Sequence, residues 1–175
     1  MPDSRLRRRT LLTAALSAAA GTAISCGTKS SGRWRYFTDD EASTVEAVTA
    51  QLIPSDSAPG AKEAGVVNYI DIQLSRAFRK HRSAYRQGLQ WIDDASRKAY
   101  GKRFVELTED QQVQVLNAAE EQSKAFFNLI LNHTRQGFYG DPRHGGNRDR
   151  TSWKMLGLGT PPVRGRQHYD SPGRA

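Results

Sequence analysis

Apolar residues recur every three or four positions along most of the chain, which is the spacing of one face of an α-helix. The series begins after residue 37 and is interrupted by short polar or Gly- and Pro-containing segments. It predicts helices over residues 39–53, 63–78, 85–99 and 123–137, and a shorter helix that starts after Thr108. The basic cluster at residues 79–82 is expected to be a solvated turn.

Several of these helices are bounded by residues that favour helix ends. Thr38 and Glu41 have the spacing of a capping box, and Thr108 begins a second box of the same form. Pro54 ends the first helix, because proline has no N–H to donate, and Gly101 is a suitable C-terminal stop for the third.

No segment alternates apolar and polar residues with the period of two that a half-exposed strand requires. The pattern therefore predicts an all-α fold, an irregular bundle of four to five helices with a Gly-rich C-terminal loop and an extended tail. The 175 residues are too few for two large domains. We expect an export signal at 1–26, a linker at 27–36, a helical domain at 37–159 with its irregular loop after residue 137, and a flexible tail at 160–175.

The first 26 residues have the composition of an export signal. A positive region precedes an apolar stretch rich in Ala and Leu, with small residues at a plausible cleavage point. Arg8 and Arg9, followed after one residue by Leu11 and Leu12, fit the twin-arginine pattern. That route carries folded proteins, so we expect the chain to be periplasmic or otherwise exported. A basic amphipathic helix that stays attached is the alternative.

Cys26 leaves two interpretations open. It ends a sequence similar to a lipoprotein cleavage box, in which the cysteine becomes the lipidated first residue, although Ala23 stands where Leu is usual. Otherwise it is removed with the signal or remains a free thiol. Because Cys26 is the only cysteine, an intrachain disulfide and a zinc site on paired cysteines are both excluded.

The net charge of +8 is concentrated at the two ends of the chain. Residues 1–25 carry +3 and residues 141–175 carry +4, so the part between them is nearly neutral. No motif with interleaved aromatic residues accompanies the basic ends. We therefore expect no nucleic-acid partner.

The chain contains no self-sufficient catalytic or metal-binding motif. No pair of histidines has the i, i+4 spacing of a helical metal site, and His133 is expected to be a hydrogen-bonded residue near a helix end. A Gly-x-Ser-x-Gly nucleophile elbow and a dinucleotide-binding glycine motif after a strand are also missing from the sequence. We expect no catalytic residue, metal or cofactor in this chain.

The Gly-rich block at residues 137–148 is the strongest candidate for a functional segment. Its glycines allow close backbone approach, and its arginines can engage carboxylates or carbonyls. Two interpretations remain open: the block clamps its own bundle, or it binds a partner. The partner-binding candidates are Phe138, Tyr139, Asp141, Arg143, Asn147, Arg148 and Trp153.

A series of motifs runs in order along residues 37–157. They are Phe37-Thr38-x-x-Glu41, Ile53-Pro54-x-Asp56, Pro59-Gly60-Ala61, Ala64-Gly65-Val66, Tyr69-Ile70-Asp71, Tyr85-Arg86-x-Gly88-Leu89, Gly137-Phe138-Tyr139-Gly140-Asp141-Pro142-Arg143-His144-Gly145-Gly146-Asn147-Arg148 and Trp153-Lys154-x-Leu156-Gly157. With these motifs the chain resembles the small (third, or gamma) subunit of membrane-bound gluconate 2-dehydrogenase and related flavin sugar dehydrogenases. It departs from that family at His144, where an aromatic residue is more usual, and in the tail after residue 159.

The resemblance implies a non-catalytic subunit that binds, stabilises and escorts an FAD-dependent dehydrogenase for gluconate, another sugar or an alcohol. The implied partners are a flavoprotein large subunit that holds FAD and a cytochrome c subunit that holds haem c. Export would use the twin-arginine translocase, and the complex would hold the chain at the membrane. The rival interpretation is an independent periplasmic enzyme or a ligand-binding lipoprotein that uses the loop from Asp141 to Arg148.

Overall fold

The computed structural model describes residues 32–159, which form six α-helices joined by short loops and 3-10 turns, with no strand in this range. The predicted all-α fold is confirmed, with six helices in place of the expected four to five. The helices are α1 (Asp39–Leu52), α2 (Val66–Ser75), α3 (Arg82–Tyr100), α4 (Glu109–Gln122), α5 (Lys124–Tyr139) and α6 (Thr151–Met155).

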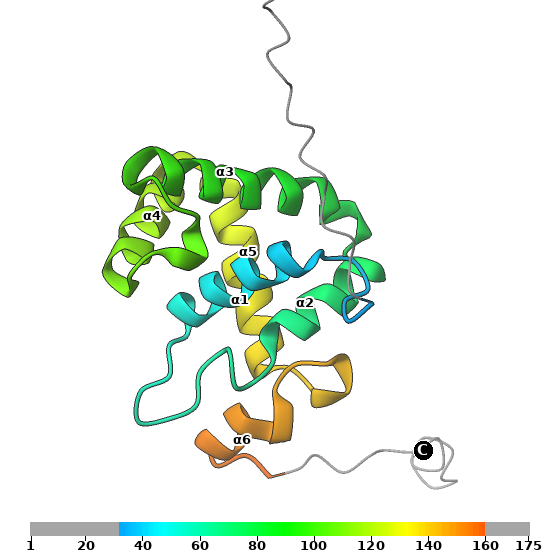
Figure 1. The fold of residues 1–175 in the computed structure, drawn as a ribbon. Coiled ribbons are helices and arrows are strands. Elements are labelled where there is room, and N and C mark those ends of the chain that lie inside the picture. The colour runs from blue at the N-terminus through cyan, green and yellow to red at the C-terminus, as the bar shows by residue number, and fades with distance from the viewer. Residues whose placement is uncertain (1–31, 160–175) are drawn as a thin grey trace, which may run out of the picture.

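Helix α5 is the centre of the arrangement, because it contacts each of the other five helices. Figure 1 shows α5 running between α3 at one end of the molecule and α6 at the other, with α1 and α2 packed across it. Helix α4 follows α3 and packs against both α3 and α5. The C-terminal loop and α6 thus lie at the opposite end from α3 and α4.

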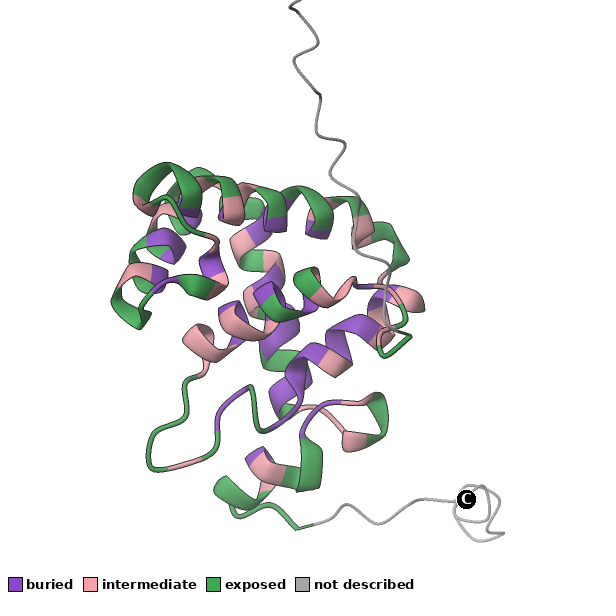
Figure 2. Cartoon of the chain, viewed as in Figure 1, coloured by how far each residue is buried: buried purple, intermediate pink, exposed green. Residues whose placement is uncertain are grey.

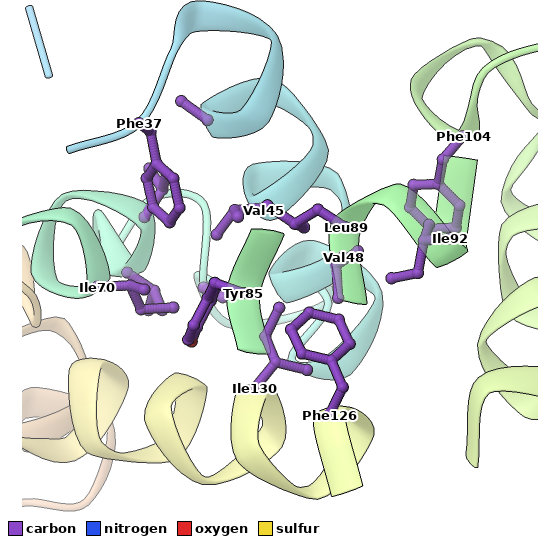
Figure 3. Packing of buried hydrophobic residues seen from close by; sticks show 14 of the residues in the cluster. Phe37, Val45, Val48, Ile70, Tyr85, Leu89, Ile92, Phe104, Phe126 and Ile130 are labelled. Carbon is purple, nitrogen blue, oxygen red and sulfur yellow. The ribbon is translucent and has the colours of Figure 1, made fainter. Parts of the chain in front are cut away.

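The hydrophobic core fills the space among α1, α2, α3, α4 and α5. Buried residues face inward on each of these helices, whereas in α6 only Ser152 is buried (Figure 2). Figure 3 shows side chains from separate elements pointing toward one another in this core. They include Phe37, Val45, Val48, Ile70, Tyr85, Leu89, Ile92, Phe104, Phe126 and Ile130.

The helix ends that rest on local chemistry lie where the sequence predicts them. The Thr38 hydroxyl accepts a hydrogen bond from the Glu41 N–H at 3.2 Å, and the Glu41 carboxylate accepts one from the Thr38 N–H at 2.9 Å. Thr108 forms the second capping box at the start of α4. Gly101 follows α3 with a left-handed φ of 71°, a conformation that glycine adopts without steric cost.

Other boundaries differ from the sequence-based expectation. Helix α2 begins at Val66 in place of residue 63, because Gly65 is left-handed, and it ends at Ser75 in place of residue 78. The expected basic turn is a 3-10 turn, Arg79–His81, that leads directly into α3. Helix α5 continues two residues beyond residue 137, and α6 lies in a segment that was expected to be irregular.

The segment before α1 is fastened to α2 by one buried carboxylate. Asp71, only 1% exposed, accepts hydrogen bonds from the backbone N–H groups of Arg35, Tyr36 and Phe37 at 2.8, 2.9 and 3.0 Å. The Phe37 side chain is then buried against the Tyr85 ring, with centroids 6.0 Å apart. Asp71 therefore fixes where the chain enters the folded body.

Helices α3 and α5 approach closely at Gly88. A Cβ atom at this position would overlap the ring of Phe126, so only glycine fits there. Phe126 in turn packs edge-on against Tyr85, with ring centroids 5.6 Å apart. The glycine of the Tyr85-Arg86-x-Gly88-Leu89 motif thus has a packing role.

Candidate functional site

The C-terminal loop begins where α5 ends, and the last two residues of the helix point in different directions. Phe138 is buried in the core, whereas Tyr139 is exposed. The chain then passes through two 3-10 turns, Pro142–His144 and Arg148–Arg150, before α6 begins. Two of the predicted partner-binding residues therefore lie on α5, although the sequence predicted that this helix ends at residue 137.

Hydrogen bonds to the backbone of this loop hold it against the bundle. The Arg148 N–H donates to the carbonyl oxygen of Ala64 at 2.9 Å, and the Asn68 side-chain amide donates to that of Gly145 at 2.7 Å. Gly146 lies so close to the Gly137 carbonyl that a Cβ atom would overlap it. The loop therefore docks on α2 and α5 through positions where a side chain would not fit.

The buried Asn147 side chain holds the two ends of the loop together. It is fully buried, its side-chain amide donates to the Gly140 carbonyl at 2.9 Å, and its Oδ1 accepts the Ser152 N–H at 3.0 Å. The same residue has a left-handed backbone, with φ of 44°. Asn147 thus connects the end of α5 to the start of α6.

Asp141 and Arg143 form an exposed ion pair within the loop. The Arg143 guanidinium donates to Asp141 Oδ2 through Nε at 3.0 Å and through its terminal nitrogen at 2.7 Å. These bonds, together with the Arg143 backbone N–H, lower the pKa of Asp141 to about 2. Each charge is already paired with the other, and the pair faces solvent.

Trp153 ties α6 to the end of α5. Its indole N–H donates to the Tyr139 carbonyl at 2.9 Å, and the ring is half-buried. The exposed residues Met155, Leu156 and Leu158 follow it. Apolar side chains are therefore exposed beside the loop, and none of these three is among the residues predicted to bind a partner, although Leu156 belongs to one of the family motifs.

The structure brings all seven predicted partner-binding residues into one region but places them differently. Phe138 and Asn147 are interior and make contacts within the chain. Arg148 is exposed, and its guanidinium lies against Gly65, with a nitrogen 3.1 Å from where a Cβ of that residue would stand. Tyr139, Asp141, Arg143 and Trp153 reach the surface at least partly.

A buried cluster of aromatic and histidine rings surrounds His133, which is hydrogen-bonded as the sequence predicted, although the cluster itself was not predicted. His133 lies within α5 and not near its end, and its Nδ1 is 3.0 Å from the Tyr85 hydroxyl. Its ring stacks on Phe78 with centroids 4.1 Å apart, and His81 lies 5.5 Å away. Burial, and then the nearby His81, lower the pKa of His133 to about 4. The position of His133 three residues after the core residue Ile130 is the signal that could have placed it inside.

A groove of about 400 Å³ lies between α1 and α3 and is lined mainly by charged side chains. Arg103 reaches Asp40 at 3.0 Å and Asp93 at 3.7 Å, and Arg97 reaches Asp94 at 3.7 Å. The lining has four acidic and three basic side chains, and the arginines Arg97 and Arg103 are already paired with carboxylates of the lining, so little charge is left to select a ligand.

Within residues 32–159, no cluster of three or more His, Cys, Asp or Glu side chains is placed to hold a metal ion. In the same range, no helix has both the length and the apolar character needed to cross a bilayer. Arg8, Arg9, Leu11, Leu12 and Cys26 lie outside the described residues.

Comparison with known proteins identifies a family. No curated protein and no solved structure matches the chain. A family model described as gluconate 2-dehydrogenase subunit 3 matches residues 39–159, which include all six helices and the C-terminal loop. The chain therefore belongs to the gluconate 2-dehydrogenase subunit 3 family.

Proposed function

We propose that this chain is the non-catalytic small subunit of an FAD-dependent gluconate, sugar or alcohol dehydrogenase, and that it binds, stabilises and escorts the catalytic subunit for export. The observation that carries the proposal is the family match, which begins at the first residue of α1 and extends past the last residue of α6. A match over all six helices concerns the whole helical body and not one recurring motif.

The proposal assigns FAD to the catalytic flavoprotein subunit and haem c to a cytochrome c subunit, with no cofactor in this chain. The periplasmic complex is held at the membrane through its partners, or through a lipid on Cys26. The purified, partner-free chain is expected to show no flavin or haem absorbance. The complex of this chain with the flavoprotein, purified from membranes, is expected to show a flavin absorbance spectrum.

The contacts of the loop do not favour the rival interpretation as an independent enzyme or ligand-binding lipoprotein. Asp141 and Arg143 are paired with each other, and both ends of the Asn147 side-chain amide are bonded to backbone. A ligand that took over Asn147 would have to displace these backbone bonds, which costs free energy because Asn147 is buried and its amide needs partners.

The escort role is tested by changing the export signal. With Arg8 and Arg9 both replaced by Lys, we expect this chain and the flavoprotein subunit to remain in the cytoplasm, because the twin-arginine translocase requires the arginine pair. Arg5→Lys makes the same chemical change outside the pair and serves as the matched control. Cell fractionation followed by immunoblotting of both subunits gives the result. Normal export of the flavoprotein with the double variant would contradict the escort role.

A further inference from the structure

Large exposed hydrophobic side chains are gathered at one end of the molecule. Of the five in the part of the chain that the structure describes, four belong to the segment from the end of α5 to just beyond α6. These are Tyr139 at 46%, Met155 at 46%, Leu156 at 53% and Leu158 at 56% exposure. Together with the half-buried Trp153 we call them the C-terminal patch. Single exposed apolar residues are ordinary, whereas a contiguous group marks an interaction site.

Hydrogen bonds hold the C-terminal patch in a fixed shape. The Trp153 indole is bonded to the Tyr139 carbonyl at 2.9 Å, and the Leu158 N–H donates to the Trp153 carbonyl at 2.7 Å. Gly157, with φ of 67°, turns the chain back after α6. A partner would therefore meet a surface that is already ordered, and binding would not have to offset the entropy of ordering it.

The charges around the C-terminal patch are mainly positive. Residues 139–159 contain four cationic and two acidic side chains, and the acidic Asp141 is already paired with Arg143. Lys154 is exposed and lies between Trp153 and Met155 in the sequence, and Arg148, in the loop before α6, is exposed as well. Charge complementarity therefore favours a partner surface with an apolar centre and carboxylates at its rim.

We infer that the C-terminal patch is the docking surface for the catalytic dehydrogenase subunit, an inference that rests on the function proposed above. A second copy of this chain is a poorer occupant, because it would bring two positive rims together. A bilayer is also poorer, because α6 has five residues and cannot lie along a membrane as a long amphipathic helix does. The aromatic, Met and Arg content of the region is that of a protein–protein interface.

The test compares the wild-type chain and variants of it, each co-expressed with the catalytic subunit. The variant Leu156→Ser with Leu158→Ser is expected to weaken the complex about tenfold or more while leaving the melting temperature of the free subunit unchanged, because both side chains are exposed. Val113→Ser is the matched control, since Val113 is 43% exposed but lies on α4 at the far end of the molecule (Figure 1). Lys154→Glu is expected to weaken the complex and to reduce its sensitivity to salt.

The other outcomes overturn the inference. An unchanged affinity of the double Ser variant for the catalytic subunit removes the patch as the docking surface but leaves the proposed function standing. Failure of the wild-type chain to copurify with that subunit ends both. An unchanged complex combined with lost binding to phosphatidylglycerol vesicles would assign the patch to the membrane. An unchanged complex combined with lost self-association in sedimentation would assign it to a second copy.

Discussion

Replacing Asp71 tests most directly whether its carboxylate holds the segment before α1 against α2. The carboxylate accepts three backbone N–H groups from the segment before α1, Oδ2 from Arg35 and Oδ1 from Tyr36 and Phe37. Asp71→Ala removes all three acceptor contacts. Asp71→Asn keeps one oxygen that can accept hydrogen bonds from the N–H groups of Tyr36 and Phe37. Its amide nitrogen faces the N–H of Arg35 and cannot accept a hydrogen bond from it.

The magnitude follows from the burial of the three N–H groups. A hydrogen bond to a charged group is worth about 1.5–3 kcal/mol, but the N–H groups of Arg35 and Tyr36 are only partly buried and can bond to water instead. The N–H of Phe37 is buried and would be left unsatisfied, which alone costs about 1–3 kcal/mol. We expect Asp71→Ala to lower the free energy of unfolding by about 3 kcal/mol and Asp71→Asn by about 1 kcal/mol.

The assay is urea and thermal unfolding of the chain without its export signal, followed by circular dichroism. For a domain of this size, the loss in Asp71→Ala corresponds to a fall in melting temperature of about 10 °C. Amide hydrogen exchange should show lost protection at residues 35–37 in the Ala variant and retained protection at 36 and 37 in the Asn variant. Asp94→Ala, which removes an exposed carboxylate 3.7 Å from Arg97, is the control that should melt like the wild type. An Asp71→Ala variant with unchanged stability and protection would refute this account.

Two further predictions concern α3 and α5. Gly88→Ala is expected to lower the free energy of unfolding by about 1–3 kcal/mol, because overlap with the Phe126 ring outweighs the roughly 1 kcal/mol that alanine gains in helix propensity. Thermal unfolding measures this change. A melting temperature at or above that of the wild type would contradict the close contact between the two helices. The pKa of His133 is about 4 in the fold and near 6.5 when unfolded, so the unfolded chain binds more protons between these values and stability falls as the pH falls through this window. His133→Asn, whose Oδ1 can still bond to the Tyr85 hydroxyl, is therefore expected to reduce the difference in melting temperature between pH 7 and pH 5; an unchanged difference would show that His133 is not the titrating group.

The parts of the fold that depend on local chemistry could be read from the sequence. The Thr38 and Thr108 capping boxes and the Gly101 stop involve residues within a few positions of each other, and all three are observed. Helix α6 could not be predicted in the same way, because five residues are too few for a periodic pattern. Its start is held by the Asn147 side chain, which lies outside the helix.

Contacts between residues that are far apart in the sequence also could not be predicted. Asp71 bonds to residues 34 to 36 positions earlier, and nothing in the local pattern specifies those partners. An acidic residue on the apolar face of α2, directly after Ile70, is nevertheless a sign of a buried and satisfied carboxylate. The glycines of the C-terminal block were correctly expected to permit close approach, but which backbone atoms approach them depends on how the loop packs on α2 and α5.

The two interpretations of the C-terminal loop, a clamp on its own bundle and a surface for a partner, need not compete, because different residues serve each. Phe138 and Asn147 point inward and fix the loop, while Tyr139 and Trp153 adjoin them and lie at or near the surface. A rigid clamp is what a preformed docking surface requires, since only an ordered surface spares a partner the entropy of ordering it. The patch variants with exposed side chains therefore separate binding from stability, whereas a change at Asn147 would alter both at once.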